Sequence, residues 1–397
     1  MPVIVLAILL QSVFDGGLRD GLLALNRGDL VSARALLESA SNQQPGNAVV
    51  WAALAQVYLK SDRKEAALEA ARRAEQLEPD NPAIEHALAM FYTGAGDPGK
   101  AAGFERRFAA TPQSDDEALF RAAKLYLQAG NPASAIETAQ AAIARKDRPA
   151  LHHFLGQAYD AEKQPARAVE EFRAAVRLAP GDEEFSFDLA QALFRSEGFA
   201  EAAAVLETSA KAHPASPQIR LALGVAYYGL RRFPEAINAF LKTIGLSPDT
   251  EQPYVFLSKM LDQPGDSLPE IQSHFEQFRR RHPDGYLGSF LVAKALMQDG
   301  GTPDQVEPLL RDAIRKNGAI WELHADLADL LSRRRDYSGA AAELEISAKL
   351  NPSEPSIPFR LARVYDRLNQ SEKASRQRAR HEELLAMPRT GMGQEKP

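Results

Sequence analysis

The stretch from Ala48 to Asn81, AVVWAALAQVYLKSDRKEAALEAARRAEQLEPDN, decides the fold of this 397-residue chain. The same frame repeats outward from it in units of 34 residues, except for one spacing of 33 before Pro149 and one of 36 before Leu287. A period of this length and regularity predicts an array of stacked helix pairs. The marker residues of the unit from Ala48 to Asn81 are Trp51, Leu54, Ala55, Tyr58, Ala67, Ala74 and Pro79, at unit positions 4, 7, 8, 11, 20, 27 and 32. The eleven units start at Phe14, Ala48, Pro82, Asp116, Pro149, Glu183, Pro217, Glu251, Leu287, Trp321 and Pro355.

Small residues mark the points where the two helices of each predicted pair approach most closely. Packed helix axes lie roughly 8–10 Å apart, and the closest approaches require small side chains. Position 8 is small in ten units: Gly21, Ala55, Ala89, Ala123, Gly156, Ala190, Gly224, Ser258, Ala328 and Ala362. Position 20 is alanine in nine units: Ala33, Ala67, Ala101, Ala135, Ala168, Ala202, Ala236, Ala340 and Ala374.

Tyrosines, prolines and glycines mark the seams and the turns of the array. A tyrosine ring at position 11 is expected to fill the seam between neighbouring pairs while its hydroxyl keeps a hydrogen-bond partner. A proline at position 32 is expected to end the second helix. Pairs such as Gly28-Asp29 fall between the two helices, where a left-handed turn is expected. The tyrosines are Tyr58, Tyr92, Tyr126, Tyr159, Tyr227 and Tyr365, and the prolines are Pro45, Pro79, Pro180, Pro214, Pro248 and Pro352.

With these residues at these positions, the chain resembles the tetratricopeptide repeat over residues 14–388. The resemblance implies an all-α fold, a right-handed α-α superhelical solenoid of about eleven helix pairs, with about 22 helices of about 10–15 residues each. It is specific for the fold and carries little information about function. It also implies that the first helix of each pair lines the concave face of the solenoid, with positions 2, 5, 9, 12 and 13 pointing into the groove.

Departures from the repeat pattern concentrate in one region. The unit that starts at Glu251 is two residues longer than the regular unit and has Pro264 and Pro269 in its inter-helix turn. A bend or an irregular unit is therefore expected at residues 262–290. The substituted packing positions are Glu270 and Val306 in place of the alanine of position 20, and Lys294 in place of the small residue of position 8.

The two ends of the chain lie outside the repeats. Residues 1–13 contain the apolar run from Val3 to Leu10, which is shorter than the roughly 20 residues that span a bilayer but suits the centre of a signal peptide. No basic residue precedes this run, and no clear small-x-small cleavage site follows it. Export to the periplasm or the exterior is expected, and the alternative is a cytoplasmic protein with an apolar first segment packed on the solenoid. Residues 389–397 are expected to be disordered.

Composition and motifs point away from catalysis and from nucleic acid. The formal net charge is −6, so no global basic field attracts nucleic acid, and there is no cysteine. The segment Gly94–Lys100 imitates a phosphate-binding loop, but no strand precedes it and Ala101 lacks the hydroxyl that such a loop requires, so a turn is expected. The histidines include no pair four residues apart with a supporting carboxylate, so neither a metal site nor a cofactor is expected. Because repeats occupy 375 of 397 residues, we expect no catalytic domain and no enzyme activity.

The groove positions of the central units mix aromatic rings with amides and cations, as peptide-binding surfaces do. Phe187, Phe194 and Tyr228 are the expected apolar anchors, although a ring at position 5 can instead belong to the core between repeats. The candidate groove residues are His86, Phe120, Lys124, His153, Gln157, Phe187, Gln191, Phe194, Tyr228 and Lys259. The distal units offer the more charged set Asp329, Arg363, Asp366 and Arg367. No asparagine pair occupies the groove positions, so a clamp for a terminal carboxylate, as in chaperone-tail-binding repeats, is not expected.

These features predict a non-catalytic scaffold that binds a peptide or protein segment on its concave face, in a bacterial envelope, secretion or polysaccharide assembly. A cytoplasmic adaptor or regulator and a regulatory arm of an enzyme complex are the alternatives. The expected partner is a protein or peptide and not nucleic acid. Contact with a membrane is expected only through the amino-terminal segment if that segment is not cleaved. The oligomeric state is left open by the sequence.

Overall fold

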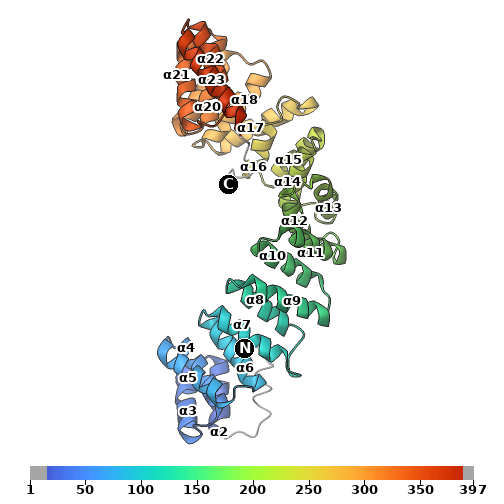
Figure 1. Cartoon of the computed structure of the whole chain (residues 1–397), viewed down its shortest axis with the longest axis vertical. Helices are drawn as coiled ribbons and strands as arrows, with labels where there is room; N and C mark the ends of the chain where they lie inside the picture. The colour runs from blue at the N-terminus through green and yellow to red at the C-terminus, as the bar shows by residue number, and fades with distance from the viewer. Residues whose placement is uncertain (1–15, 388–397) are drawn as a thin grey trace. The chain divides into compact units, whose positions relative to one another are not determined.

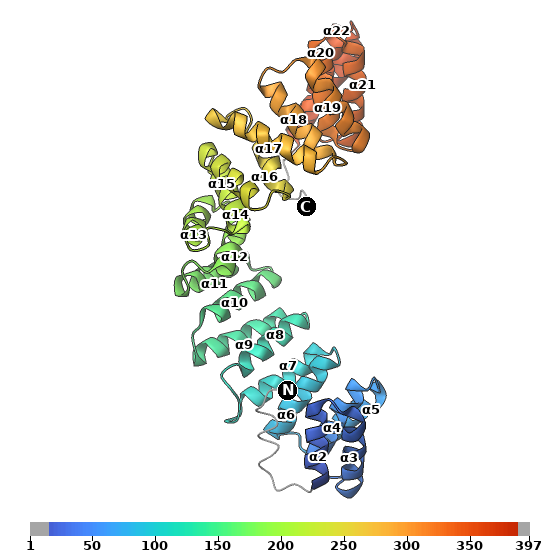
Figure 2. The same cartoon turned by 180° about the vertical axis from the view of Figure 1, so that it is seen from behind.

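The computed structural model describes residues 16–387, and within that range every regular element is a helix (Figures 1 and 2). The first helices of the successive pairs are α2 (Gly16–Arg27), α4 (Ala48–Lys60), α6 (Pro82–Gly94), α8 (Ala118–Gln128), α10 (Pro149–Ala161), α12 (Glu183–Phe194), α14 (Pro217–Gly229), α16 (Glu251–Ser258), α18 (Tyr286–Gln298), α20 (Trp321–Arg333) and α22 (Ser356–Arg367). The second helices are α3 (Leu30–Gln43), α5 (Lys64–Leu77), α7 (Pro98–Ala109), α9 (Pro132–Arg145), α11 (Pro165–Leu178), α13 (Phe199–Ala212), α15 (Phe233–Leu246), α17 (Leu268–Arg281), α19 (Pro303–Lys316), α21 (Tyr337–Leu350) and α23 (Ser371–Ala386).

The predicted all-α solenoid of stacked helix pairs is confirmed, with 22 α-helices in the described range. Every second helix except α17 begins at the seventeenth residue of its predicted unit. Two helices fall outside the expected 10–15 residues, because α16 has 8 residues and α23 has 16. The repeat frame therefore gives the helix boundaries almost throughout.

Besides the 34-residue repeat units, the described residues form two larger compact units, the first unit and the second unit, divided between Gly198 and Phe199. The first unit runs from α2 to α12, and the second runs from α13 to α23. Within each unit most consecutive helices pack against each other, and some first helices also contact the first helix of the next pair, as α2 contacts α4, α4 contacts α6 and α16 contacts α18. Each unit therefore presents its own row of first helices.

Short polar side chains and prolines fix where the helices start. At α6, the side chain of Asn81 accepts a hydrogen bond of 2.9 Å from the backbone N–H of Ala83, and Pro82 is the first helical residue. Proline suits this position because its missing N–H would have no partner inside the helix. Asp97 caps α7 in the same way by accepting from the N–H of Lys100 at 3.0 Å. The segment Gly94–Lys100 is therefore the turn that the sequence predicts.

The small residues lie where the helices pack most tightly, as predicted. All nine alanines of position 20 are fully buried, with 0% of their surface exposed. A Cβ added to Gly156 would lie 2.5 Å from Cε1 of Phe172, and one added to Gly224 would lie 2.6 Å from Cε1 of Phe240. Only glycine leaves room for these rings, which come from the second helix of the same pair.

Tyrosines of position 11 connect one pair to the pair before it. The hydroxyl of Tyr227 donates a hydrogen bond of 2.8 Å to Glu207, twenty residues earlier. Burial and this interaction raise the pKa of Tyr227 to about 12. The same hydrogen bond joins Tyr58 to Glu38 at 3.0 Å and Tyr365 to Glu345 at 2.6 Å. In these units the expected hydroxyl partner is a glutamate on the preceding second helix.

The turn between the two helices of every pair contains one residue with positive φ, at the fifteenth position of the regular unit. Five of these residues are glycine, which adopts the left-handed region without steric cost. The other six are Asp62, Lys163, Glu197, Arg231, Arg335 and Asn369, with φ between 56° and 65°. The expected left-handed turn is confirmed, although most of the pairs form it without glycine.

The pair that starts at Glu251 is irregular and corrects two residue assignments. A 3₁₀ helix, η1 (Gly265–Ser267), precedes α17, which begins one residue later than the frame requires. As a result, the exposed Glu270 does not occupy the packing position, and the fully buried Ile271 does.

Lys294 is displaced in the opposite direction, because α18 begins one residue early. Ala293 is the eighth residue of α18 and is fully buried, while the ammonium of Lys294 lies 5.0 Å from the ring centroid of Phe290. The predicted substitution at position 8 is therefore wrong, whereas Val306 does occupy position 20 and is fully buried. The predicted bend at residues 262–290 stays a prediction.

Several predictions concern residues outside the described range. The apolar segment at residues 1–13 and the tail at residues 389–397 both lie beyond it. Among the helices of residues 16–387, none is long and apolar enough to cross a membrane.

Candidate functional site

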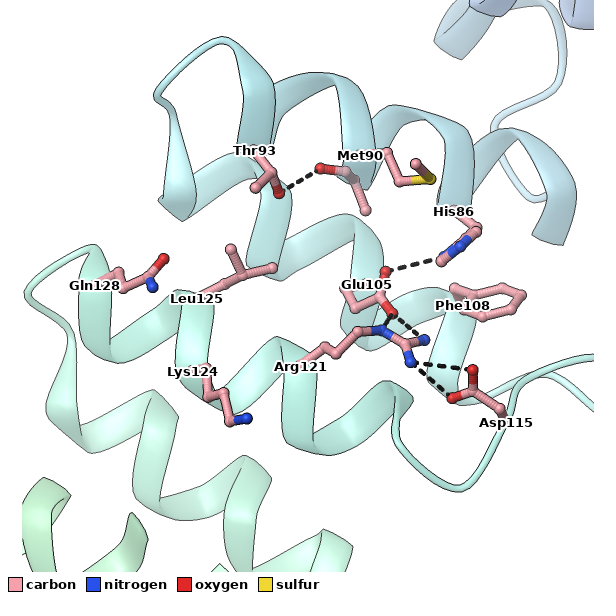
Figure 3. Close-up of a pocket in the computed structure, with 11 residues that line it drawn as sticks. His86, Met90, Thr93, Glu105, Phe108, Asp115, Arg121, Lys124, Leu125 and Gln128 are labelled. Atoms are coloured by element: carbon pink, nitrogen blue, oxygen red, sulfur yellow. Dashed lines mark hydrogen bonds and ion pairs between the residues drawn. The ribbon is translucent and has the colours of Figure 1, made fainter. Parts of the chain in front are cut away.

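A pocket of about 440 Å³ opens in the first unit between α6, α7 and α8 (Figure 3). The connection from α7 to α8 spans residues 110–117, whereas the other connections between successive pairs of this unit have three or four residues. This longer connection brings Asp115 to the pocket. The rest of the lining consists of His86, Ala89, Met90 and Thr93 from α6, Glu105 and Phe108 from α7, and Arg121, Lys124, Leu125 and Gln128 from α8.

One side of the pocket is built on a buried carboxylate, that of Glu105, which is 3% exposed. Its Oε2 lies 3.1 Å from Nδ1 of His86, and its Oε1 accepts a hydrogen bond of 2.7 Å from Nε of Arg121. The guanidinium of Arg121 also donates through Nη1 to both carboxylate oxygens of Asp115 at 3.0 Å. Figure 3 shows the guanidinium between the two carboxylates. The network joins α6, α7, α8 and the connecting segment.

Electrostatics favour the ionised forms of Asp115 and Arg121. Burial by itself would raise the pKa of Asp115, but its hydrogen bonds to Arg121 and the charge of that residue hold the pKa below its ordinary value. Burial would likewise lower the pKa of Arg121, and the two carboxylates outweigh it and raise the pKa. The lining of the pocket therefore combines these paired polar side chains with apolar side chains that include Met90 and Leu125.

Two predicted groove residues, His86 and Lys124, line this pocket. The ring of Phe120 does not, because it is 9% exposed and packs edge to face on Phe154 with centroids 5.5 Å apart. The ammonium of Lys124 lies 3.9 Å from the centroid of Phe120. Phe120 therefore supports the lysine from the core and offers little surface to a ligand.

A second set of predicted residues lies on α10 and α12 of the first unit. The buried His153 is joined through Nε2 to Oδ2 of Asp188 at 2.8 Å, an interaction that lowers the pKa of Asp188. Gln157 and Gln191 are exposed, and Phe187 is half-buried. These side chains lie outside the pocket of α6–α8.

The remaining predicted residues are distributed over both units. Phe194 is the last residue of α12 and is half-buried. In the second unit, the half-buried ring of Tyr228 packs edge to face on Phe233 and Phe256, with centroid separations of 6.0 and 5.3 Å. Lys259 is exposed, and its ammonium lies 5.9 Å from the centroid of Phe256. Their roles as ligand contacts stay predictions.

Several lining residues were not singled out by the sequence. Met90, Thr93 and Gln128 occupy the groove positions 9, 12 and 13, so the repeat frame itself was the signal for them. Glu105 and Arg121 occupy positions 24 and 6, for which the frame predicts no groove contact. Their part in the site depends on the contact between the two side chains, and the repeat period does not predict that contact.

Comparison with known proteins places these features in a family context. Among curated proteins, the human PEX5-related protein is 26% identical over 193 residues, a match that spans 43% of this chain and 29% of that protein. Two similar solved structures are Naa15/Naa10 bound to HypK-THB, at 13% identity and a TM-score of 0.46, and yeast Tom70, at 15% identity and a TM-score of 0.44. The first similarity covers 92% of this chain and 67% of that chain, and the second covers 94% and 92%.

Family models give the decisive match. Two models described as tetratricopeptide repeat match residues 24–91, 120–183, 187–250 and 325–375, which together make up more than half of the chain. The unmatched residues 251–324 include the irregular pair around α16 and α17. The chain belongs to the tetratricopeptide-repeat family.

Proposed function

We propose that the chain is a non-catalytic interaction protein that binds a segment of another protein, with an apolar side chain of that segment inserted in the pocket between α6 and α8. The pocket is the observation that carries this proposal. Its volume of about 440 Å³ falls in the range of about 300–1,000 Å³ that is typical of ligand sites. Membership of the tetratricopeptide-repeat family favours a protein as the partner.

The lining suits a peptide in two ways. Met90 and Leu125 are half-buried and provide apolar surface. When a side chain fills the pocket, this surface is removed from water, which favours binding. The exposed Thr93, Lys124 and Gln128 lie around that surface and can exchange hydrogen bonds with a peptide backbone. A ligand held by one apolar anchor and a few polar contacts fits this arrangement.

Selection from a library of displayed random peptides on the full chain tests the proposal. The selected peptides are expected to share an apolar residue and to bind with a measurable affinity in fluorescence anisotropy. Thr93→Arg and Gln128→Arg place bulky side chains at exposed lining positions, so each is expected to weaken binding about tenfold or more without changing the thermal melt. Leu68→Arg, at an exposed position of α5, is the matched control and should bind normally. Equal binding by all variants would show that the ligand uses another surface.

We further propose that the protein acts after export, within an envelope, secretion or polysaccharide assembly of a bacterium. What supports this setting is the apolar run from Val3 to Leu10. Intact mass after expression in a bacterium provides the test, because export predicts removal of the amino-terminal segment. An unprocessed cytoplasmic product would favour the cytoplasmic adaptor, and co-purification with a stoichiometric enzyme would favour the regulatory arm.

A further inference from the structure

A second cavity, of about 390 Å³, lies in the second unit between α20, α21 and α22. Four arginines line it: Arg333 at the end of α20, and Arg360, Arg363 and Arg367 on α22. The lining holds a single carboxylate, that of Asp329. The cavity therefore has three positive charges in excess, in a chain whose formal net charge is −6.

Neighbouring carboxylates leave this excess charge uncompensated. Asp329 pairs with Arg360, with Oδ2 and Nη2 3.3 Å apart. Within residues 16–387, the guanidinium groups of Arg333, Arg363 and Arg367 have no carboxylate oxygen within 4.0 Å. All three side chains are exposed, and the guanidinium of Arg363 lies 5.9 Å from the ring centroid of Phe359. They are available to an anion that enters the cavity.

Helix stabilisation does not explain the whole cluster. Arg333 and Arg367 end their helices, where a cation interacts favourably with the helix dipole. Arg363 lies a full turn before the end of α22 and shares one helix face with Arg360 and Arg367. Like charges three and four residues apart destabilise a helix by about 0.2–0.5 kcal/mol per pair. An arrangement that costs stability within the helix is consistent with a ligand that neutralises it.

We propose that this cavity binds an acidic peptide segment through the side-chain carboxylates of the segment. Arg363 and Arg367 are one helical turn apart, about 6 Å along the axis. Alternate side chains of an extended chain are about 6.6 Å apart and lie on the same side. Two acidic residues in an acidic-x-acidic pattern therefore match the two guanidiniums, each of which can bind a carboxylate bidentately.

The remaining polar groups complete the recognition. Arg333 approaches from α20 and provides a third cation, and the half-buried Tyr337 and Ser332 offer hydroxyl groups to the peptide backbone. Burial raises the pKa of Asp329 in spite of the nearby arginines, so even the single internal carboxylate competes weakly with an incoming anion. The site belongs to the second unit and does not depend on the pocket of α6–α8.

Fluorescence anisotropy on the full chain tests the proposal with a labelled peptide of alternating glutamate and threonine, blocked at both ends. The glutamate peptide is expected to bind at least about tenfold more tightly than its glutamine counterpart, and added salt should weaken it because the contacts are ionic. Arg363→Gln with Arg367→Gln should reduce binding about tenfold. Arg72→Gln with Arg73→Gln, exposed on α5, removes the same charge elsewhere and should leave binding unchanged.

The charge-reversed double variant Arg363→Glu with Arg367→Glu provides a second test, in which a new binding activity is expected. This variant should lose the glutamate peptide and bind the corresponding lysine peptide, a result that a merely unfolded protein cannot produce. Three outcomes would overturn the proposal: equal binding of the glutamine peptide, an equal loss in the α5 control, and binding that requires a free carboxyl terminus. Displacement by inorganic phosphate at equal concentration would identify a phosphate site instead and would also overturn it.

Discussion

The guanidinium of Arg121 on α8 lies 2.6 Å from the carboxylate of Glu105 on α7, a side chain that is almost completely removed from water. This ion pair of Arg121 and Glu105 connects two consecutive repeats and forms part of the lining of the pocket between them. A buried carboxylate that loses its cation is costly, because neither water nor another charge replaces the lost interaction.

Arg121→Met should therefore destabilise the first unit by about 1–3 kcal/mol, less than for a fully buried pair because the arginine is partly exposed. Urea unfolding of the full chain, followed by circular dichroism, measures the change. Arg376→Met removes an exposed partner of Glu372 and should cost under about 0.5 kcal/mol. Adding Glu105→Gln to Arg121→Met should recover part of the loss, and no recovery would mean that the arginine acts through packing alone.

The contact between Gly156 and Phe172 predicts opposite effects for the same substitution at two sites. Gly156→Ala forces a methyl group into the ring and should destabilise by about 1–3 kcal/mol. Gly103→Ala, inside α7, places its Cβ where no atom lies within 4 Å and should stabilise by up to about 1 kcal/mol because alanine favours the helix. Thermal unfolding of both variants measures the difference. Phe172→Leu combined with Gly156→Ala should show a favourable coupling energy, and strict additivity would contradict the steric explanation.

Asp326 on α20 predicts a pH dependence of stability. Its Oδ2 is buried without a hydrogen-bond partner, and burial raises its pKa to about 6. Lys294 and Arg360 oppose this rise, while Asp329 and Glu322 add to it. The unfolded carboxyl has a pKa of about 3.9, so the folded state binds the proton more tightly. The contribution of Asp326 to stability is therefore greatest below about pH 4 and is lost as the pH rises through about 6.

Asp326→Asn should remove this loss, since the amide stays neutral. We expect the variant to gain on the order of 1–3 kcal/mol over the native chain at pH 8 and little at pH 4. Chemical denaturation at the two pH values measures this difference. Asp262→Asn, at an exposed position, should show no such gain. If the two variants respond alike to pH, the buried oxygen of Asp326 is not the cause.

The repeat period predicts much of this structure because most contacts join residues of one pair or of adjacent pairs. The burial of Ala67 and Ala168 and the space that Gly156 leaves for Phe172 follow directly from their positions in the unit. The frame also assigns Asp329 and Arg363 to groove positions, and both line the distal cavity.

The remainder depends on residues that do not follow the period. One extra residue in the turn before α17, which contains η1, places Ile271 where the frame expects Glu270. The pocket of α6–α8 depends on a long connection and on the meeting of Glu105 with Arg121, sixteen residues apart. Arg333 is the last residue of α20, and only the proximity of α22 makes it part of a basic cavity.

The six left-handed turn residues that are not glycine are positions where substitution could raise the thermal stability of this chain. Each holds a side chain in a region that costs roughly 1–2 kcal/mol for an L-residue, partly offset in a glycine variant by roughly 0.5–1 kcal/mol of extra chain entropy. The residues belong to different repeats and line neither cavity, so small gains at them should accumulate independently of ligand contacts. Heat tolerance could therefore be raised turn by turn without altering the lining of either cavity.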